Sequence, residues 1–266
     1  MSNFQLRVLS SVVLAAAVLW LTWLGGMPFR VLCALIAGAI LYEWTRMVRP
    51  SAGKSAGFLS EALLLVLMLA LILGFSAPVL FAAGAIAVIL VGVVSGLRGA
   101  GQWEAAGLAY AVLSGFSLAF LRGDGHSGLV AMLFLFAVVW ATDIFAYFVG
   151  RAVGGPKLAP AISPGKTRSG AVGGIVGGIV AGLILVVAAD GGRYAVMAVV
   201  ALVLSIVSQA GDLFESWVKR RHGCKDSSAL IPGHGGVMDR VDGLVAAALV
   251  FCLMGWASAT VEHLGA

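Results

Sequence analysis

Charged residues are scarce in this 266-residue chain: Asp, Glu, Lys and Arg together make up 11% of it, whereas 61% is hydrophobic. A soluble globular domain carries roughly a quarter of its residues as charged ones. The composition therefore excludes that class and indicates an integral membrane protein. The apolar runs also lack the polar and apolar alternation of transmembrane strands, which excludes an outer-membrane barrel and predicts helical spans.

Cysteine is equally sparse, because the chain has only Cys33, Cys224 and Cys252, with no CxxC spacing among them. Neither a disulfide framework nor a cysteine-rich metal site is expected. A zinc site built from His222, Cys224 and His234 stays open as a minor alternative.

The chain does contain nine apolar runs of about 20 residues, the length that crosses the hydrocarbon core of a bilayer. The first of them lacks a small-x-small cleavage site, so we interpret it as a retained helix rather than a signal peptide. The runs predict an all-α polytopic membrane protein with helices near residues 6–24, 29–46, 58–75, 78–96, 104–121, 127–149, 170–189, 194–216 and 241–260.

The basic residues are unevenly distributed over the predicted loops. Fourteen of the 17 lie near the N-terminus or in even-numbered loops, and only Arg30, Arg122 and Arg193 lie on the other side. The positive-inside rule then places the N-terminus and the even-numbered loops in the cytoplasm. We therefore expect a multi-pass protein of a bacterial-type inner membrane whose active site faces the cytoplasm.

The two halves of the chain differ in polar content, so we divide it into an N-terminal transmembrane scaffold, residues 1–121, and a C-terminal catalytic region, residues 122–266. In the scaffold, Glu43 and Glu61 are most simply explained as interfacial charges. In the catalytic region, a glycine every four residues from Gly170 to Gly182 indicates close helix packing. No nucleic-acid partner is expected, and the sequence leaves a homodimer open.

One predicted helix and the loop after it carry the first polar group. Asp143, Tyr147 and Arg151 follow one another at intervals of four and share a helix face. The loop contains Ser163, Lys166 and Thr167 beside further basic residues. Its Gly-Lys-Thr triplet is not a Walker motif, because Pro160 stands where that motif requires glycine. A basic, hydroxyl-rich loop at a helix N-terminus suits anions, although its charges could also serve topology alone.

A second polar group begins as a stripe on the helix predicted at 194–216. Its members recur at helical spacing and are Ser205, Ser208, Gln209, Asp212, Glu215, Ser216 and Lys219. Facing such a stripe to lipid would be costly, so it is expected to line a protein interior or a watery cleft. A buried Asp212 neutralised by a basic neighbour is the simpler alternative.

The stretch from Ser205 to Asp242 holds five of the twelve carboxylates in the chain. Within it, Asp239 and Asp242 lie one turn apart at the start of the last predicted helix and repel one another unless a cation lies between them. Hard oxygen donors without a histidine and cysteine set favour Mg²⁺ that keeps some waters and bridges to phosphate. The stretch therefore predicts a metal and phosphate site.

These residues resemble the signature of the phosphatidate cytidylyltransferase, or CDP-diacylglycerol synthase, family. The matching positions are Gly211-Asp212, Glu215-Ser216, Lys219-Arg220, Lys225-Asp226-Ser227, Pro232-Gly233-His234-Gly235-Gly236, Asp239-Arg240 and Asp242. Residues 143–167 resemble a second sequence element of the same family. The chain departs from the family pattern at Ser169, where the family often has an acidic residue. The resemblance implies a reaction of phosphatidate with CTP that gives CDP-diacylglycerol and pyrophosphate, with a divalent cation and an accessory K⁺.

The resemblance also implies roles for individual residues. Metal ligation falls to Asp212 and Asp239, with Asp242 a weaker candidate. The catalytic set comprises these first two with Lys219, Arg220, Lys225, Asp226 and Arg240. Substrate binding falls to Asp143, Ser163, Lys166, Thr167, Ser216, Ser227, His234, Gly235 and Gly236. The substrates CTP and phosphatidate would meet at the surface of the lipid bilayer.

Two other classes of function share some of these features. A CTP-dependent polyprenol or lipid kinase would use a similar site but transfer the γ-phosphoryl group. An ion-coupled transporter would also bury carboxylates, but transporters with inverted repeats carry broken helices in both halves. This chain confines its polar cluster to the C-terminal part, which favours the enzyme.

Overall fold

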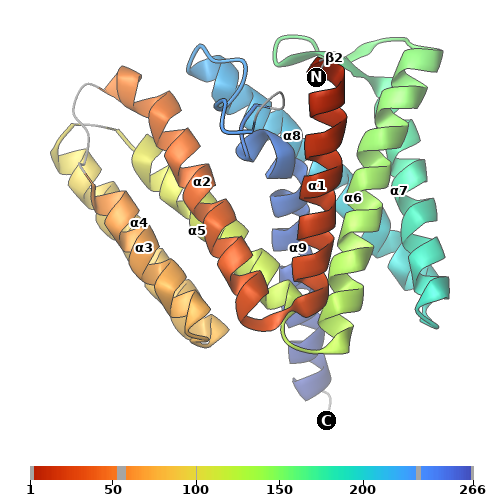
Figure 1. Ribbon diagram of the computed structural model, residues 1–266, viewed down its shortest axis with the longest axis horizontal. Coiled ribbons are helices and arrows are strands. Elements are labelled where there is room, and N and C mark those ends of the chain that lie inside the picture. Colours follow the sequence, from red (N-terminus) through yellow and green to blue (C-terminus); the bar gives the residue numbers. More distant parts are fainter. Residues whose placement is uncertain (1–2, 53–57, 100, 232–234, 265–266) are drawn as a thin grey trace. The chain divides into compact units, whose positions relative to one another are not determined.

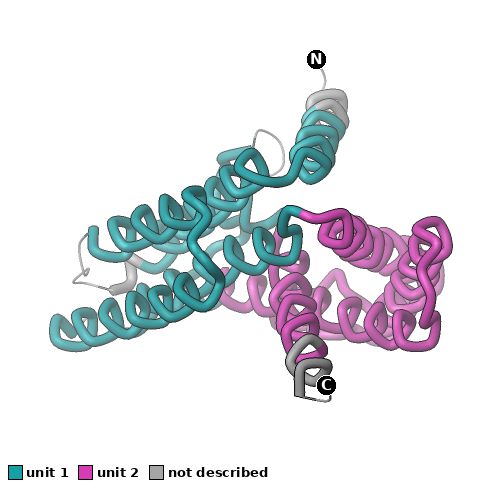
Figure 2. Tube along the Cα trace, turned by 90° about the horizontal axis from the view of Figure 1, so that it is seen from below, with its two compact units in different colours: residues 1–124, 221–240 teal, residues 125–220, 241–266 magenta. Residues whose placement is uncertain are grey.

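The computed structural model describes residues 3–52, 58–99, 101–231 and 235–264, and within them the chain is almost entirely helical (Figure 1). Two compact units divide it (Figure 2). The first comprises Met1–Asp124 together with Arg221–Arg240. The second comprises Gly125–Arg220 and Val241–Ala266. The chain thus leaves the first unit, forms most of the second, and returns to the first before its last helix.

The first unit contains five helices: α1 (Asn3–Leu24), α2 (Gly26–Ala52), α3 (Leu59–Ile72), α4 (Ala77–Leu97) and α5 (Trp103–Arg122). Its core lies along α5, which packs on α2, α3 and α4. Trp44 of α2 is buried and donates its indole N–H to the Trp103 carbonyl at 2.8 Å. Gly107 makes room for that indole, because a Cβ at this position would overlap the ring of Trp44.

Two arginines that the sequence analysis counted only as loop charges have specific partners in this unit. Arg122 is buried and donates from Nε to the Thr22 carbonyl at 2.6 Å and from Nη2 to the Trp23 carbonyl at 3.2 Å. These carbonyls lie in the last turn of α1, so Arg122 caps that helix end. Arg30 forms an ion pair with Asp124 at 3.0 Å. Both side chains therefore stabilise the unit through specific contacts.

The second unit contains α6 (His126–Val153), β1 (Lys157–Ala159), β2 (Ser163–Thr167), α7 (Arg168–Ala188), α8 (Tyr194–Arg221) and most of α9 (Met238–Leu264). The antiparallel β1–β2 hairpin joins the C-terminal end of α6 to the N-terminal end of α7 (Figure 1). The sequence predicted a loop here. Pro160 follows Ala159, whose carbonyl accepts from the Ile162 amide at 3.1 Å. Proline at the second position of a β-turn explains the hairpin.

The predicted close packing of the glycine-rich helix is confirmed, because Gly170, Gly174, Gly178 and Gly182 of α7 are all buried. A Cβ at Gly174 would lie 2.8 Å from the backbone carbonyl of Thr142 in α6. Gly178 and Gly182 face α8 as well, where a Cβ would approach Ser205 and Ala201 to 3.3 and 3.2 Å respectively. The glycine face therefore brings the backbones of α6 and α8 close to α7.

Substituting Gly174 with alanine tests this packing. The new methyl group meets a backbone carbonyl that cannot rotate away, so we expect a loss of about 1–3 kcal/mol of stability. The measurement is the midpoint of thermal unfolding in detergent. Gly255→Ala in α9 is the matched control, because a Cβ there meets nothing within 4 Å. Equal midpoints for the two variants would contradict the packing.

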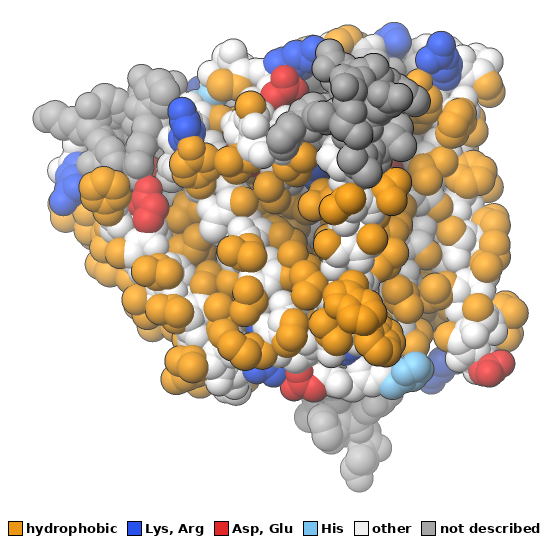
Figure 3. All heavy atoms as spheres, in the orientation of Figure 1, with side chains coloured by type: hydrophobic (Ala, Val, Ile, Leu, Met, Phe, Trp, Pro, Cys, Tyr) orange, Lys and Arg blue, Asp and Glu red, His pale blue; other side chains and the backbone are white. Residues whose placement is uncertain are grey.

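Seven of the described helices are long and apolar enough to span a membrane: α2, α4, α5, α6, α7, α8 and α9. The nine spans expected from the sequence are thus supported only as a polytopic helical fold. Helix α3 ends at Ile72 after 14 residues, a length of about 21 Å that is shorter than the hydrocarbon core. The described apolar part of α1, Ser10–Leu24, is also short. Figure 3 shows hydrophobic side chains along the visible flanks of the helices and charged ones near their ends.

Candidate active site

The polar stripe predicted on α8 is turned inward in the second unit. Ser205, Ser208, Glu215 and Lys219 are buried, although the helix as a whole is apolar. Ser205 accepts a hydrogen bond from the Thr142 hydroxyl of α6 at 2.8 Å. The stripe therefore faces protein rather than lipid, as the cost of exposing it to hydrocarbon requires.

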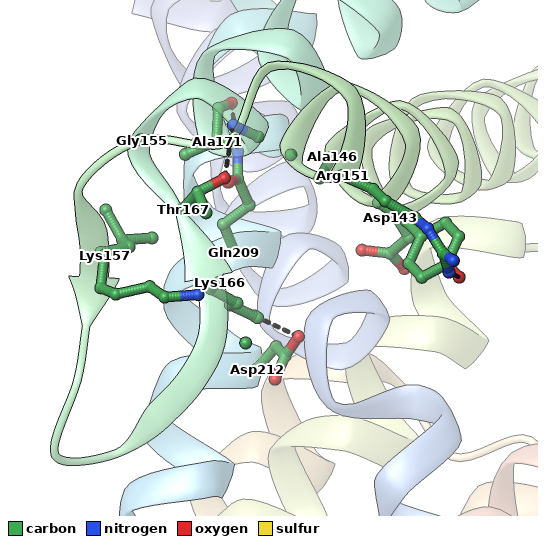
Figure 4. Close-up of a pocket in the computed structure, with 16 residues that line it drawn as sticks. Asp143, Ala146, Arg151, Gly155, Lys157, Lys166, Thr167, Ala171, Gln209 and Asp212 are labelled. Carbon is green, nitrogen blue, oxygen red and sulfur yellow. Dashed lines mark hydrogen bonds and ion pairs between the residues drawn. The ribbon is translucent and has the colours of Figure 1, made fainter.

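A cavity of about 690 Å³ opens where this stripe meets α6, α7 and the hairpin (Figure 4). Both polar groups found in the sequence contribute to its lining: Asp143, Tyr147 and Arg151 from α6, Lys157, Lys166 and Thr167 from the hairpin, and Gln209 and Asp212 from α8. Glycines at positions 150, 165 and 170 also line it and keep the wall close to the backbone. The three polar residues predicted to share one face of α6 therefore all line this cavity.

The central contact of the pocket is an ion pair between the Lys166 ammonium of β2 and the Asp212 carboxylate of α8 (Figure 4). Both side chains are about one-third exposed, at 29% and 31%, so incoming solutes can reach them. Asp143 is close enough to interact electrostatically with both, repelled by Asp212 and attracted by Lys166. Ser216 donates a weaker hydrogen bond to Asp212 at 3.4 Å. Asp212 therefore does have the basic neighbour that the simpler alternative expected. The pair is nevertheless still accessible from the cavity.

The hairpin is fixed to α7 by its own hydroxyl groups. Thr167 is the N-cap of α7, and its Oγ1 accepts from the Gly170 amide at 3.1 Å. Ser169 lies 3.1 Å from the Thr167 hydroxyl and donates to the Gly154 carbonyl. Thr167 thus lines the cavity as a helix cap. The Gly-Lys-Thr triplet lies within β2, so its strand geometry agrees with the exclusion of a Walker loop.

The second unit also holds the acids that suit a hard cation. Asp242 interacts electrostatically with Asp212 and Asp143, and its Oδ1 accepts from the Gly243 amide at 2.7 Å. Glu215 forms a 2.8 Å ion pair with Lys219. The carboxylates of Asp143, Asp212 and Asp242 repel one another, and oxygen donors of this kind fit Mg²⁺ chemistry. Among the described residues, however, no group of three His, Cys, Asp or Glu side chains is already arranged around a common metal position.

A second polar cluster lies in the first unit and centres on Glu43 of α2. Its side chain is fully buried and accepts four hydrogen bonds from the loop between α8 and α9. The donors are Ser227 Oγ at 3.0 Å, Ser228 Oγ at 2.6 Å, Val237 N at 2.8 Å and Met238 N at 2.7 Å. The interpretation of Glu43 as an interfacial charge is therefore wrong. Its place inside an apolar helix was the signal that could have identified it.

Asp239 completes this cluster at the start of α9. Its Oδ2 accepts from the Ser227 amide at 3.0 Å and the Gly236 amide at 2.9 Å, and it lies 2.8 Å from the Ser227 hydroxyl. Gly235 adopts a φ of +85°, a left-handed conformation that favours glycine. The carboxylate predicted to hold a metal is thus also the residue around which the loop folds. Asp239 and Asp212 belong to different units, so their joint role in metal binding stays a prediction.

The remaining residues predicted for the site are divided between the two units. Lys225, Asp226 and Arg240 lie with Asp239 in the first unit, whereas Lys219, Arg220 and Ser163 lie in the second. Arg220 donates to the Ile162 carbonyl in the hairpin turn at 3.4 Å, and Ser163 pairs with Ala159 in the hairpin register. His234 lies outside the described residues.

The zinc alternative gains no support from the described part of the chain. His222 packs its ring edge-on against Trp103 with centroids 4.7 Å apart. Burial, and then the positive charge of Arg221, lower the pKa of His222 below its usual value. The Cys224 thiol donates to the His222 backbone carbonyl at 3.5 Å. Residues 3–52, 58–99, 101–231 and 235–264 contain no three-ligand cluster that includes either side chain.

The seven long apolar helices found among the described residues define a polytopic membrane protein. The lysines and carboxylates that line one cavity give it a polar site of the kind found in enzymes. The chain belongs to the Cytidylyltransferase family, whose model matches residues 5–257. It is therefore a nucleotidyltransferase, as the resemblance of its signature residues implied.

Relatives in three bacterial groups cover nearly the whole chain. A protein of Brucella abortus named phosphatidate cytidylyltransferase is 49% identical over 96% of this chain and 94% of its own length. Proteins with the same name in Haemophilus influenzae and Bacillus subtilis are 35% and 31% identical, over 92% and 91% of this chain and 96% and 94% of their own lengths. The similarity thus includes the N-terminal helices, for which the sequence analysis found no matching motif.

Proposed function

We propose that this protein is a phosphatidate cytidylyltransferase, which joins the cytidylyl group of CTP to phosphatidate and releases pyrophosphate. The observation that carries the proposal is the cavity in which Lys157, Lys166 and Arg151 accompany Asp143 and Asp212 in a chain of the Cytidylyltransferase family. Cations attract the phosphates of both substrates, and the apolar helices provide the lipid environment that phosphatidate requires.

In this reaction an oxygen of the lipid phosphate attacks the α-phosphorus of CTP, and the bond to the β-phosphate oxygen breaks. Negative charge increases on the transferring group and on the departing pyrophosphate, so positioning and charge neutralisation account for most of the catalysis. Lys166 suits this role because its ammonium faces the cavity while Asp212 orients it. The attacking phosphate is already ionised near neutral pH, so no general base is required.

Mg²⁺ is part of the proposal, with K⁺ as an accessory ion. Within the second unit Asp212 and Asp242 would hold the divalent ion, since their carboxylates repel one another without it. A bound Mg²⁺ would neutralise the phosphate oxygens of CTP. Participation of Asp239 is proposed from the sequence signature alone.

The location of the reaction is also proposed from the sequence. The distribution of basic residues supports a cytoplasmic active site in a bacterial-type inner membrane. CTP would then reach the cavity from the cytoplasm, and phosphatidate from the adjacent leaflet.

Incubation of the purified protein with labelled CTP, phosphatidate and Mg²⁺ tests the proposal. We expect labelled CDP-lipid and pyrophosphate as products. CDP with a phosphorylated alcohol in place of phosphatidate would instead indicate the related lipid kinase. No nucleotide turnover with either acceptor would overturn the assignment of the cavity to catalysis.

Replacing Lys166 with glutamine tests the role of its charge. We expect the KM for CTP to rise about 10-fold, the scale of one lost charge-assisted contact to phosphate. Arg168→Gln is the matched control, because it removes one positive charge two residues away on an exposed side chain outside the cavity lining. Equal KM values for the two variants would remove Lys166 from CTP binding.

A further inference from the structure

Glu43 lies far in sequence from the loop that joins α8 to α9, but it accepts hydrogen bonds from both ends of that loop. Ser227 and Ser228 lie near the start of the loop, and Val237 and Met238 lie at its end. The sequence separations are 184 to 195 residues. One carboxylate on α2 thus closes the loop on itself, and all five residues belong to the first unit.

The bonds from Val237 and Met238 have a further consequence for α9. These amides lie at the start of the helix, where backbone N–H groups have no partner within the helix. A carboxylate at a helix N-terminus is also favoured by the helix dipole. Glu43 therefore caps α9 from another helix and fixes where α9 begins, one residue before Asp239.

Ser227 connects Glu43 directly to Asp239. Its hydroxyl lies 3.0 Å from Glu43 Oε2 and 2.8 Å from Asp239 Oδ2, so it can donate to either carboxylate. Gly236 contacts the same two groups, because its amide donates to Asp239 Oδ2 at 2.9 Å and a Cβ there would lie 2.6 and 2.7 Å from the Glu43 oxygens. The position of the Asp239 side chain therefore depends on an intact contact between Glu43 and the loop.

We propose that Glu43 is a positioning residue of the cytidylyl-transfer reaction, which holds the loop bearing Lys225, Asp226 and Asp239 in its active shape. The inference rests on the proposed function. It assigns a role in catalysis to the N-terminal helices, where the sequence analysis placed only scaffold.

Glu43→Gln is a sharp test because it keeps the size of the side chain. The amide NH₂ replaces one of the two oxygens, and each oxygen accepts from a backbone N–H, of Val237 or of Met238. Whichever way the glutamine is oriented, a donor then faces a donor that cannot rotate away. Glu43→Asp keeps both oxygens but withdraws them by one methylene, so it should restore part of the function that glutamine loses.

The experiment combines amide hydrogen exchange with kinetics on the full-length protein in detergent. In Glu43→Gln we expect exchange at Val237 and Met238 to accelerate at least 10-fold through the lost hydrogen bonds, and exchange at Ser227, whose amide donates to Asp239, to accelerate as the loop loosens. We expect kcat to fall about 30-fold and both KM values to change less than about 3-fold, because positioning affects the transition state more than binding. Glu43→Asp should lie between these values and wild type.

Glu61→Gln on α3 is the matched control, since it removes the same charge from a different helix, where the Glu61 carboxylate accepts a hydrogen bond from the neighbouring Ser60 hydroxyl at 2.9 Å. Unchanged exchange in Glu43→Gln would overturn the contact. Accelerated exchange with the kcat of the Glu61 control would overturn the positioning role. Absence of CDP-lipid from the wild-type reaction would overturn the proposed function instead, while the exchange data would still decide the contact.

Two milder variants decide the question if Glu43→Gln does not fold. Ser228→Ala removes one of the four donors, and Ser227→Ala removes the hydroxyl between the two carboxylates. We expect each to lower kcat by about 3- to 10-fold, with accelerated exchange confined to the loop. Wild-type exchange and kcat in both variants would overturn the proposal.

Discussion

Asp212→Asn is expected to lower kcat/KM by about 1,000-fold, the scale on which loss of one preorganised charge affects a transition state. Asparagine keeps the shape of the side chain but loses its negative charge. The ion pair with Lys166 is then lost, and the ammonium is no longer held over the cavity. Removing the carboxylate also removes one of the groups proposed to hold Mg²⁺. Steady-state assays of CDP-lipid formation measure the effect.

Asp190→Asn provides the matched control for this substitution. Asp190 lies in the exposed turn after α7 and adopts a φ of 51°, a left-handed conformation that asparagine also tolerates. We expect wild-type turnover from this variant. Near-normal activity of Asp212→Asn, measured on folded and monodisperse protein, would exclude Asp212 from the active site.

Gly236→Ala is expected to lower kcat by about 100-fold, since it disturbs the carboxylates of Glu43 and Asp239 and charge positioning accounts for much of the catalysis. The added Cβ would overlap the Ser227 hydroxyl and lie 2.6 Å from Glu43 Oε1. These side-chain atoms could move aside only by breaking their hydrogen bonds. Hydrogen bonds to charged groups contribute about 1.5–3 kcal/mol each, so the midpoint of thermal unfolding should fall as well.

Gly38→Ala is the control for Gly236→Ala, because it makes the same change in the exposed part of α2, where a Cβ meets nothing within 4 Å. Alanine is favoured over glycine inside a helix by about 1 kcal/mol, so this variant should be as stable as wild type or slightly more stable. Wild-type activity from Gly236→Ala would show that the loop has room for a side chain and that its observed geometry is not required.

Much of the helical fold could be predicted, because it depends on local sequence. Long apolar runs gave helices close to α4, α5, α7 and α8, and the four-residue spacing of glycine identified the packed face of α7. The hairpin was missed because its strands are only three and five residues long. Its turn signal, Ala159-Pro160, was present but was considered only as evidence against a Walker motif. The short α3 was overestimated because hydrophobicity continues past Ile72.

The candidate site was predictable where its residues share a helix or adjoin one. Asp143, Tyr147 and Arg151 fell on one face of α6, and the inward stripe of α8 followed from the cost of exposing it to lipid. Contacts over long sequence separations could not be derived in this way. Spacing alone does not show that Lys166 pairs with Asp212, or that Glu43 accepts bonds from a loop nearly 190 residues later.

The contact between Glu43 and the loop has a consequence for biogenesis. Residues 221–240 belong to the first unit but are synthesised after most of the second, so helices α1 to α5 are synthesised before their last partner exists. Until then the Glu43 carboxylate lacks its four donors, and an unsatisfied charge in an apolar surrounding is costly. The first unit can therefore mature only after residues 227–238 have been synthesised. A chain that stops before residue 227 would retain an exposed defect that quality-control proteases can recognise.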